Sequence, residues 1–204
     1  MAQRGKFIVI EGLDGSGKST QLKMLEDELR AQGRTICRTA EPTGGDVGRA
    51  IRRALSGDEP RTTAQLAALF LADRIEHNAE IAAHLDAGED VICDRYFYSS
   101  MAYQGPLTDP DWVADMNRRC PAIAKPDLCV FLDVDYRKCK ARLDAGRDKL
   151  EIYERDLSFM ESTRSAFLAV FRRYESEDRI VIVDADRELD AVAADILAAV
   201  QKIL

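Results

Sequence analysis

Short apolar runs alternate with stretches of helical spacing along the whole chain. The runs are rich in Val, Ile and Leu, as expected of strands that are covered on both faces. They predict strands over residues 7–10, 35–39, 91–93, 128–132 and 180–183. This alternation predicts an α/β fold, in which a five-stranded parallel sheet with right-handed crossovers is flanked by helices.

Breaker and capping residues mark the ends of several expected helices. Thr62 and Gln65 form a capping box that opens a long alanine-rich helix, and Gly88 closes it. Further helices are expected between the phosphate loop and Gly33, over residues 47–55, between Pro110 and Pro121, around residues 159–171, and over residues 189–203. Ligands of such a sheet collect beyond the carboxyl ends of its strands, and this is where candidate functional residues are sought.

The first strand runs directly into the stretch Gly12-Leu13-Asp14-Gly15-Ser16-Gly17-Lys18-Ser19-Thr20. This stretch satisfies the phosphate-loop pattern GxxxxGK[ST]. Glycines let backbone N–H groups turn inward around phosphate oxygens, and the following helix adds its N-terminal dipole. Lys18 can reach the β- and γ-phosphates, and the Ser19 hydroxyl can bind Mg²⁺. The motif predicts that all nine residues bind ATP, with Mg²⁺ as cofactor.

Length, charge and cysteine pattern indicate the number of domains, the excluded partners and the cellular compartment. The 204 residues predict one domain, and their formal net charge of −7 argues against a nucleic-acid groove as the main surface. No apolar run approaches the length of a membrane span, and no signal-peptide core is seen at the N-terminus. Cys93 and Cys129 lie inside apolar runs, and the five cysteines show no CxxC spacing. We therefore expect free thiols and a cytoplasmic protein without membrane partners.

Several classes of protein carry a phosphate loop. A GTPase would place a Lys-x-Asp guanine reader after a strand, whereas Lys125-Pro126-Asp127 precedes the fourth expected strand. Motor and transporter ATPases usually need further modules, for which this length leaves little room. A small phosphotransferase therefore fits best, and a regulator that keeps ATP as a structural ligand is the alternative outside enzymes.

Further segments follow the loop in a fixed order: Glu41-Pro42-Thr43-Gly44, Ala72-Asp73-Arg74, Asp94-Arg95-Tyr96, Ser99 to Gly105, and Tyr153-Glu154-Arg155. Together with the loop they resemble the thymidylate kinase (dTMP kinase) family, from residue 7 to about residue 170. The resemblance implies a nucleoside monophosphate kinase fold, a homodimer, and phosphorylation of dTMP to dTDP by ATP with Mg²⁺. A kinase for another nucleoside monophosphate is the alternative among enzymes.

The resemblance also implies which residues bind the acceptor dTMP: Asp14, Glu41, Pro42, Phe70, Arg74, Arg95, Ser100, Tyr103, Gln104 and Glu154. Phe70 and Arg74 lie four apart on one helix face, which suits a ring stacked on the base and a guanidinium on the monophosphate. Tyr103 is expected to face the sugar and disfavour a ribose 2′-hydroxyl. Lys18 and Arg95 are expected to be catalytic, because two anionic phosphates must be brought together.

Asp94 and the basic stretch ending at Lys149 complete the prediction. Asp94 follows a strand as a Walker-B acid does and could hold Mg²⁺ through water, or could instead anchor the Arg95 loop. Basic residues on both sides of Gly146 predict a lid over about residues 142–152, and a solvated helix face is the alternative.

The phosphate loop has no basic residue between Gly12 and Gly17, and the resemblance implies that the lid then supplies the catalytic cation. Arg147 and Lys149 are the candidates, with Arg142 in reserve. Ala40 precedes Glu41 where many bacterial relatives carry arginine, so one expected positive charge near the acceptor is missing.

Overall fold

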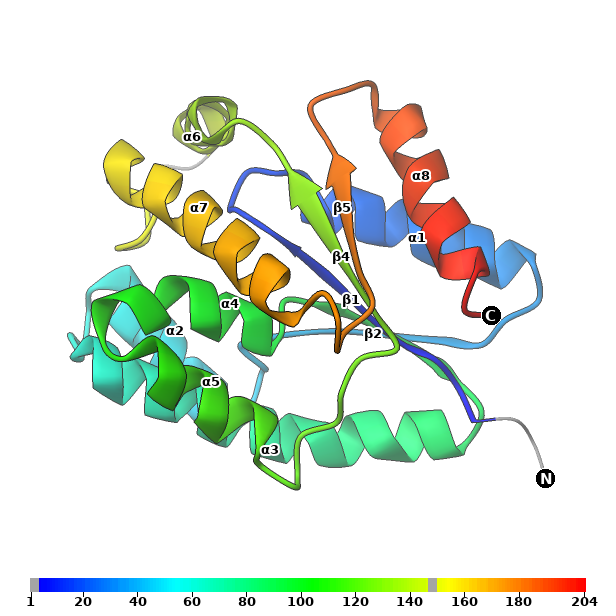
Figure 1. The fold of residues 1–204 in the computed structure, drawn as a ribbon, viewed down its shortest axis with the longest axis horizontal. Coiled ribbons are helices and arrows are strands. Elements are labelled where there is room, and N and C mark those ends of the chain that lie inside the picture. Colours follow the sequence, from blue (N-terminus) through cyan, green and yellow to red (C-terminus); the bar gives the residue numbers. More distant parts are fainter. Residues whose placement is uncertain (1–3, 147–149) are drawn as a thin grey trace.

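The structure, a computed structural model, describes residues 4–146 and 150–204. Within these residues lies a five-stranded sheet in the order β2-β3-β1-β4-β5, and every neighbouring pair is parallel (Figure 1). The strands are β1 (Phe7–Gly12), β2 (Ile36–Ala40), β3 (Asp90–Asp94), β4 (Leu128–Asp133) and β5 (Ile180–Asp184). The predicted α/β fold with its parallel sheet is confirmed, and the five expected strands are present with small shifts at their ends.

The described helices are α1 (Lys18–Ala31), α2 (Asp46–Ser56), α3 (Thr63–Asp86), α4 (Phe97–Tyr103), α5 (Pro110–Arg118), α6 (Tyr136–Gly146), α7 (Leu157–Tyr174) and α8 (Leu189–Gln201). Because β1 connects to β2 in one direction across the sheet and later strands progress in the other, right-handed crossovers put α1 on one face and α3, α4 and α7 on the opposite face. Helix α8 packs beside α1 (Figure 1). The capping box predicted at Thr62 and Gln65 opens α3.

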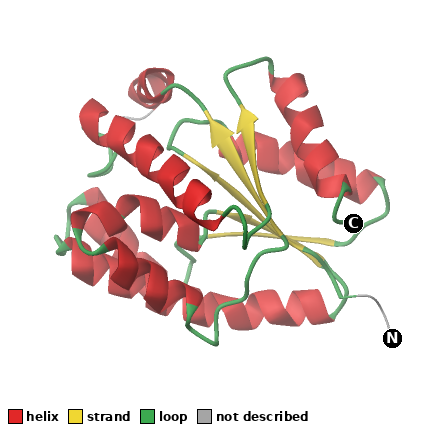
Figure 2. Cartoon of the chain, in the orientation of Figure 1, coloured by secondary structure: helices red, strands yellow, loops and turns green. Residues whose placement is uncertain are grey.

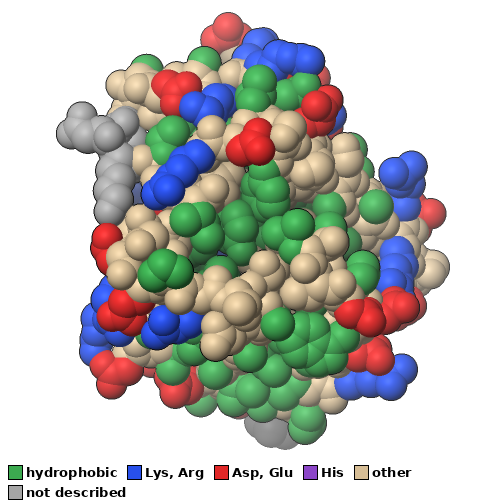
Figure 3. All heavy atoms as spheres, turned by 90° about the vertical axis from the view of Figure 1, so that its left-hand side faces the viewer, with side chains coloured by type: hydrophobic (Ala, Val, Ile, Leu, Met, Phe, Trp, Pro, Cys, Tyr) green, Lys and Arg blue, Asp and Glu red, His purple; other side chains and the backbone are tan. Residues whose placement is uncertain are grey.

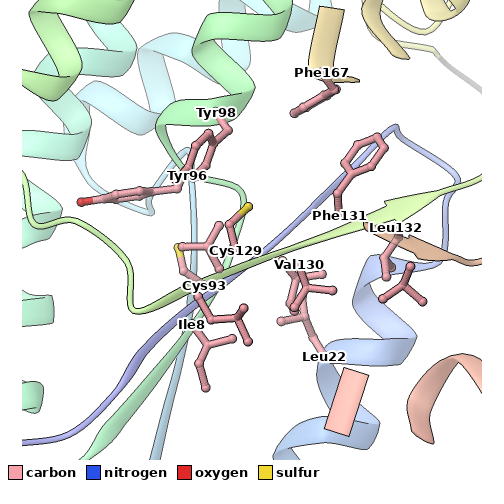
Figure 4. Close-up of a cluster of buried hydrophobic side chains, with 14 of the residues drawn as sticks. Ile8, Leu22, Cys93, Tyr96, Tyr98, Cys129, Val130, Phe131, Leu132 and Phe167 are labelled. Atoms are coloured by element: carbon pink, nitrogen blue, oxygen red, sulfur yellow. The ribbon is translucent and has the colours of Figure 1, made fainter. Parts of the chain in front are cut away.

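The core fills both faces of the central strands. Every residue of β1 is buried, as are the apolar residues of β4. Figure 4 shows Leu22 of α1 below the strands and Phe167 of α7 above them. The rings of Phe131 and Phe167 lie 5.0 Å apart between centres. The double-sided burial explains why these strands are apolar without alternation.

Parallel strands bring their carboxyl ends to one edge of the sheet, where the loops after β1, β3 and β4 meet (Figure 2). The predicted phosphate loop, Asp94 and Arg95 all follow strands at this edge. None of the described helices has the length and apolar character needed to cross a bilayer.

Candidate active site

The loop between β1 and α1 folds around the ammonium group of Lys18. Nζ of Lys18 donates hydrogen bonds to the carbonyl oxygens of Gly12, at 3.0 Å, and Leu13, at 2.9 Å. Gly15 and Gly17 have φ angles of +81° and +95°, a region in which an L side chain is strained. Gly17 is also the N-cap of α1, so this turn directs the first backbone N–H groups of the helix toward the loop. The loop therefore has the conformation of an anion cradle.

Lys18 lies in a strong and mixed electrostatic field, and its side chain is almost fully buried. Burial lowers the pKa of Lys18, and the guanidinium of Arg95 lowers it further. The carboxylates of Asp14, Asp94 and Glu11 act in the opposite direction, without reversing the net decrease. Lys18 and Arg95 thus place two cations among three acids at the strand ends.

Arg95 joins the phosphate loop to the end of β3. Its Nη2 donates to Oδ1 of Asp14 at 2.7 Å, and its Nη1 donates to Oγ of Ser99 at 3.1 Å. The centre of the guanidinium lies 5.3 Å from the centre of the Tyr103 ring. The backbone of Arg95 has a φ of +69°, which is rare for a residue with a side chain and marks a locally strained position.

Glu11, the penultimate residue of β1, is fully buried beneath the turn that carries Arg95. One carboxylate oxygen accepts the backbone N–H groups of Tyr96, at 2.9 Å, and Ser99, at 3.1 Å. The other accepts the Ser99 hydroxyl at 2.6 Å. Burial raises the pKa of Glu11 to about 7, although Arg95 and these hydrogen bonds act to lower it.

A cleft of about 720 Å³, partly open to solvent, extends from Arg95 to α3. All the residues expected to bind the acceptor line it, except Glu154. A second hollow lies over the phosphate loop and is lined by Lys18, Ser19, Thr20 and Asp94 among others. The two share the residues Asp14, Glu41, Pro42, Arg52 and Arg95. The phosphate loop and the deeper cleft are therefore continuous.

Arg74 of α3 forms part of the deep wall of this cleft and is only 1% exposed. Its Nε and Nη2 lie 2.8 and 2.6 Å from the same oxygen of Glu41. Its Nη1 donates to Asn117 at 2.5 Å and contacts the Ser100 hydroxyl at 3.3 Å. Nδ1 of His77 lies 3.1 Å from the other Glu41 oxygen. Arg74 is thus a buried charge with acceptors on several sides.

A family model for thymidylate kinase matches residues 10–196 of the chain. The chain belongs to the thymidylate kinase family. A probable thymidylate kinase of Caldivirga maquilingensis is 36% identical over 96% of this chain and 93% of its own length. A probable thymidylate kinase of Methanococcus aeolicus is 38% identical over 90% of this chain and 89% of its own length. A thymidylate kinase of Leifsonia xyli is 38% identical over 94% of this chain and 92% of its own length.

Membership of the thymidylate kinase family confirms the resemblance drawn from the motifs. Among the expected residues, Tyr103 lies with its hydroxyl 3.4 Å from Asp14 and its ring 5.4 Å from that of Tyr153. Nε2 of Gln104 lies 3.4 Å from the Tyr153 hydroxyl. Phe70 and Pro42 contribute apolar surface to the cleft.

Glu154 occupies a different place from the other predicted residues of this thymidylate kinase family member. It is buried, and its carboxylate accepts the backbone N–H of Glu151 at 2.8 Å. Together with Leu13 and Tyr103 it lines a smaller void behind the main cleft. Its carboxylate therefore lies behind Tyr103 rather than in the cleft wall.

Sequence reasoning gave no role to several residues of the site, among them Arg52, Asn117 and Tyr153. Arg52 of α2 lines both hollows and donates hydrogen bonds to the backbone carbonyls of Pro42 and Thr43. It stands in a basic run that looks like a solvated face, yet it is three residues before the cleft residue Leu55 and shares its helix face. No motif marks Asn117, which is fully buried and accepts a hydrogen bond from Arg74.

The lid prediction is only partly covered by the structure. Arg147 and Lys149 lie outside the described residues. Arg142, the reserve candidate, lies on α6, and its Nη1 donates to the carbonyl oxygen of Gly15 at 3.1 Å. Helix α6 packs closely there, because a Cβ on Gly15 would lie 2.5 Å from the carbonyl oxygen of Cys139. A cation from the predicted lid stretch thus contacts the phosphate loop.

Two buried polar atoms at this edge of the sheet lack hydrogen-bond partners among the described residues: Oγ of Ser16 and Oδ1 of Asp94. Asp94 and Ser19 line the same hollow over the phosphate loop. No cluster of three or more metal-binding side chains occurs in the described part of the chain. Mg²⁺ in kinases is held by one or two protein groups together with substrate phosphates, so a single orphaned carboxylate oxygen beside a hydroxyl fits that ion.

Proposed function

We propose that this protein phosphorylates dTMP to dTDP with ATP as the phosphoryl donor. Membership of the thymidylate kinase family carries this assignment, and the predicted enzyme class agrees with it. The observation that supports it in the structure is the continuity of the two hollows, with Arg95 and Asp14 lining both. A donor phosphate over Lys18 and an acceptor in the deeper cleft would then meet beside Arg95.

On the donor side, the phosphate loop and Lys18 are proposed to bind the ATP phosphates. Among the described residues, Nζ of Lys18 donates hydrogen bonds to backbone carbonyls, which phosphate oxygens can replace with stronger charge-assisted bonds. Arg142 already reaches the loop from α6 and is proposed to cover it. We also propose a lid over about residues 142–152, with Arg147 as a further catalytic cation. This proposal rests on the family resemblance.

On the acceptor side, the position of Arg74 supports a role different from the one first expected. Arg74 lines the deep cleft but not the hollow over the phosphate loop, whereas Arg52 and Arg95 line both. We therefore assign the acceptor phosphate to Arg52 and Arg95, and a carbonyl edge of the base to Arg74. Arg52 would supply the positive charge that Ala40 does not.

The remaining cleft residues fit the other parts of dTMP. Phe70 offers a ring for stacking on the base, and Ser100 and Gln104 lie within reach of a polar base edge. Tyr103 and Asp14 are proposed to face the sugar, since their polar groups are already within 3.4 Å of each other. A 2′-hydroxyl would have to enter this packed pair.

Mg²⁺ is proposed as the cofactor, held by the Ser19 hydroxyl and by Asp94. When bound, it would neutralise charge on the donor phosphates. Asp94 contributes the orphaned oxygen described above, and Ser19 lies exposed at the start of α1. The rest of the coordination would come from substrate and water, as is usual for this ion.

A homodimer is proposed on the surface of α3, which runs along the lower margin of Figure 1. A stripe of half-buried or exposed apolar residues follows this helix: Ala64, Ala68, Leu71, Ile75 and Ala79. Ile75 is 38% exposed, and such a row at helical spacing is suited to helix pairing. Sedimentation should show a dimer that Ile75→Glu dissociates. Trp112→Glu, the same kind of change at an exposed residue of α5, should not dissociate it.

We also propose a single domain over residues 1–204 and a cytoplasmic location. All five cysteines are described and none forms a disulfide, which supports a reducing compartment. Figure 3, which views the left-hand side of Figure 1, shows hydrophobic side chains near the middle of this face, with charges of both signs around them.

The test of the proposed function is an acceptor screen. ADP formation with ATP-Mg²⁺ should be fast with dTMP and slow with dCMP, CMP, GMP and AMP. A clear preference for another monophosphate would assign the cleft to that nucleotide. Binding of ATP without ADP formation from any acceptor would identify a regulator and refute the kinase assignment.

A further inference from the structure

The hydroxyl of Ser99 lies between a buried carboxylate and the guanidinium of Arg95. It donates to Oε2 of Glu11 at 2.6 Å and accepts from Nη1 of Arg95 at 3.1 Å. Oε1 of Glu11 holds the backbone N–H groups of Tyr96 and Ser99. Glu11 therefore fastens the segment that carries Arg95 to the end of β1, from which the phosphate loop starts.

The direction of these hydrogen bonds is set by chemistry. A serine hydroxyl has one proton, and an ionised Glu11 carboxylate can only accept, so the Ser99 proton points toward Glu11 when that carboxyl is ionised. The lone pairs of Ser99 then face the N–H of Arg95, which can only donate. Removal of the Glu11 carboxylate would leave the Ser99 hydroxyl free to rotate. The hydrogen bond between Ser99 and the Arg95 guanidinium would then be weaker.

We propose that Glu11 and Ser99 are positioning residues, which fix the guanidinium of Arg95 at the junction of the two hollows. The inference rests on the proposed function, in which Arg95 lies between donor and acceptor phosphates. Asp14 holds one terminal nitrogen of Arg95 and Ser99 holds the other, so the two contacts together set the plane of the group. With Ser99 removed, the described hydrogen bonds left to the guanidinium are those of Nη2, to Asp14 at 2.7 Å and to the Tyr103 hydroxyl at 3.5 Å. Nη1 then lacks its serine partner, and the group can turn about Nη2.

The kinetic consequence follows from where Arg95 acts. A cation that is misplaced by a fraction of an ångström at the transfer point stabilises the transition state less, while nucleotides still bind. Ser99→Ala should therefore lower kcat by about tenfold to a hundredfold, with little change in the KM for ATP. Ser99→Thr keeps the hydroxyl and should restore most of the rate. Glu11→Gln, which cannot accept the Ser99 proton at the same place, should resemble Ser99→Ala.

Tyr98→Phe is the matched control for damage to α4. Tyr98 is the neighbour of Ser99, and its hydroxyl donates to Asp178 at 2.8 Å on the far side of the helix. Removing it deletes one buried hydrogen bond from the same helix without touching Arg95. Its kcat should equal that of the wild type, even if its unfolding free energy falls. A kcat loss in Tyr98→Phe equal to that in Ser99→Ala would overturn the proposal.

A second comparison tests whether Ser99 acts through Arg95. In an Arg95→Ala background, the further change Ser99→Ala should have little effect, because the group that it positions is gone. A full additional loss of kcat in the double variant would mean that Ser99 acts independently of Arg95. This would refute the positioning role of Ser99.

A nucleotide-free crystal structure of Ser99→Ala provides a readout that does not need turnover. The Arg95 guanidinium should leave its wild-type plane or show several positions, while α4 stays in place. An unchanged guanidinium would overturn the proposal. If the wild-type enzyme failed to phosphorylate dTMP, the proposed function would fail. This crystal structure would still decide whether Ser99 positions the Arg95 guanidinium.

Discussion

Replacing Glu11 by glutamine should change how the stability of this protein depends on pH. Burial raises the pKa of Glu11 from 4.5 to about 7, so at pH values between these the folded protein keeps a proton that the unfolded chain releases. Unfolding then liberates a proton and becomes more favourable as pH rises. The wild type should lose stability from about pH 4.5 to pH 7 and level off above. Glu11→Gln has no such proton and should lack this slope.

The size of the effect follows from the separation of the two pKa values. One pKa unit corresponds to about 1.4 kcal/mol, so the interval from 4.5 to about 7 corresponds to about 3 kcal/mol. Most of this falls between the two pKa values, from about pH 4.5 to about pH 7. Over that range the unfolding free energy of the wild type should fall by about 2 to 3 kcal/mol relative to that of Glu11→Gln.

Urea unfolding followed by circular dichroism at closely spaced pH values measures this difference. All other titrating groups are common to both proteins, so their contributions largely cancel when the profiles are subtracted. Glu188→Gln makes the same chemical change at an exposed side chain and should give a profile parallel to that of the wild type. If the Glu11→Gln profile were also parallel, the buried carboxyl would not be protonated near neutral pH and the reasoning would be wrong.

Three further outcomes are expected. Lys18→Ala should lower kcat about a hundredfold or more with the fold intact by circular dichroism, and a variant with most of its activity would remove Lys18 from the mechanism. Arg74→Ala should raise the KM for dTMP far more than that for ATP. It should also cost about 3 to 5 kcal/mol of stability, because the buried Glu41 carboxylate loses its arginine partner and keeps only the His77 contact among those described. Equal rises in both KM values would contradict the assignment to the acceptor. Tyr103→Ala should relax the preference for dTMP over its ribonucleotide while Tyr103→Phe keeps it, and a wild type indifferent to the 2′-hydroxyl would exclude Tyr103 from sugar selection.

The fold was predictable because its signals are local and repeated. Runs of buried β-branched residues, as in β1 and β4, require cover on both faces, and the capping box of Thr62 and Gln65 defines the start of α3. The order of the strands was harder to predict, since the sequence alone does not state on which side of β1 each later strand pairs. Helix α4 was also not delimited, because its seven residues carry side chains buried on nearly all sides.

The candidate site, like the fold, could be predicted from the sequence only in part. Residues in tight motifs, such as Lys18 and Arg95, could be placed at the strand ends, because the motif spacing fixes their position after β1 and β3. The surroundings of Arg74 could not be predicted, because they come from Glu41 and Asn117, which are distant in sequence. Only the folded chain shows that its guanidinium is enclosed by acceptors in the deep cleft.

The three cations Lys18, Arg95 and Arg74 differ in how strongly their hydrogen-bond partners in the protein hold them. Arg74 is enclosed by a carboxylate, an amide and a hydroxyl in a buried wall, so an arriving phosphate would have to break a buried ion pair to capture it. Lys18 is held through Nζ by two carbonyl oxygens, which are weaker partners than a phosphate. Arg95 lies between these cases, with one carboxylate, that of Asp14, and the hydroxyls of Ser99 and Tyr103 as partners. A phosphate can therefore exchange most easily with the partners of Lys18 and least easily with those of Arg74. This ordering runs from the loop to the deep cleft. Charge is therefore most available where the donor phosphates would bind, and most fixed where a neutral base would be recognised.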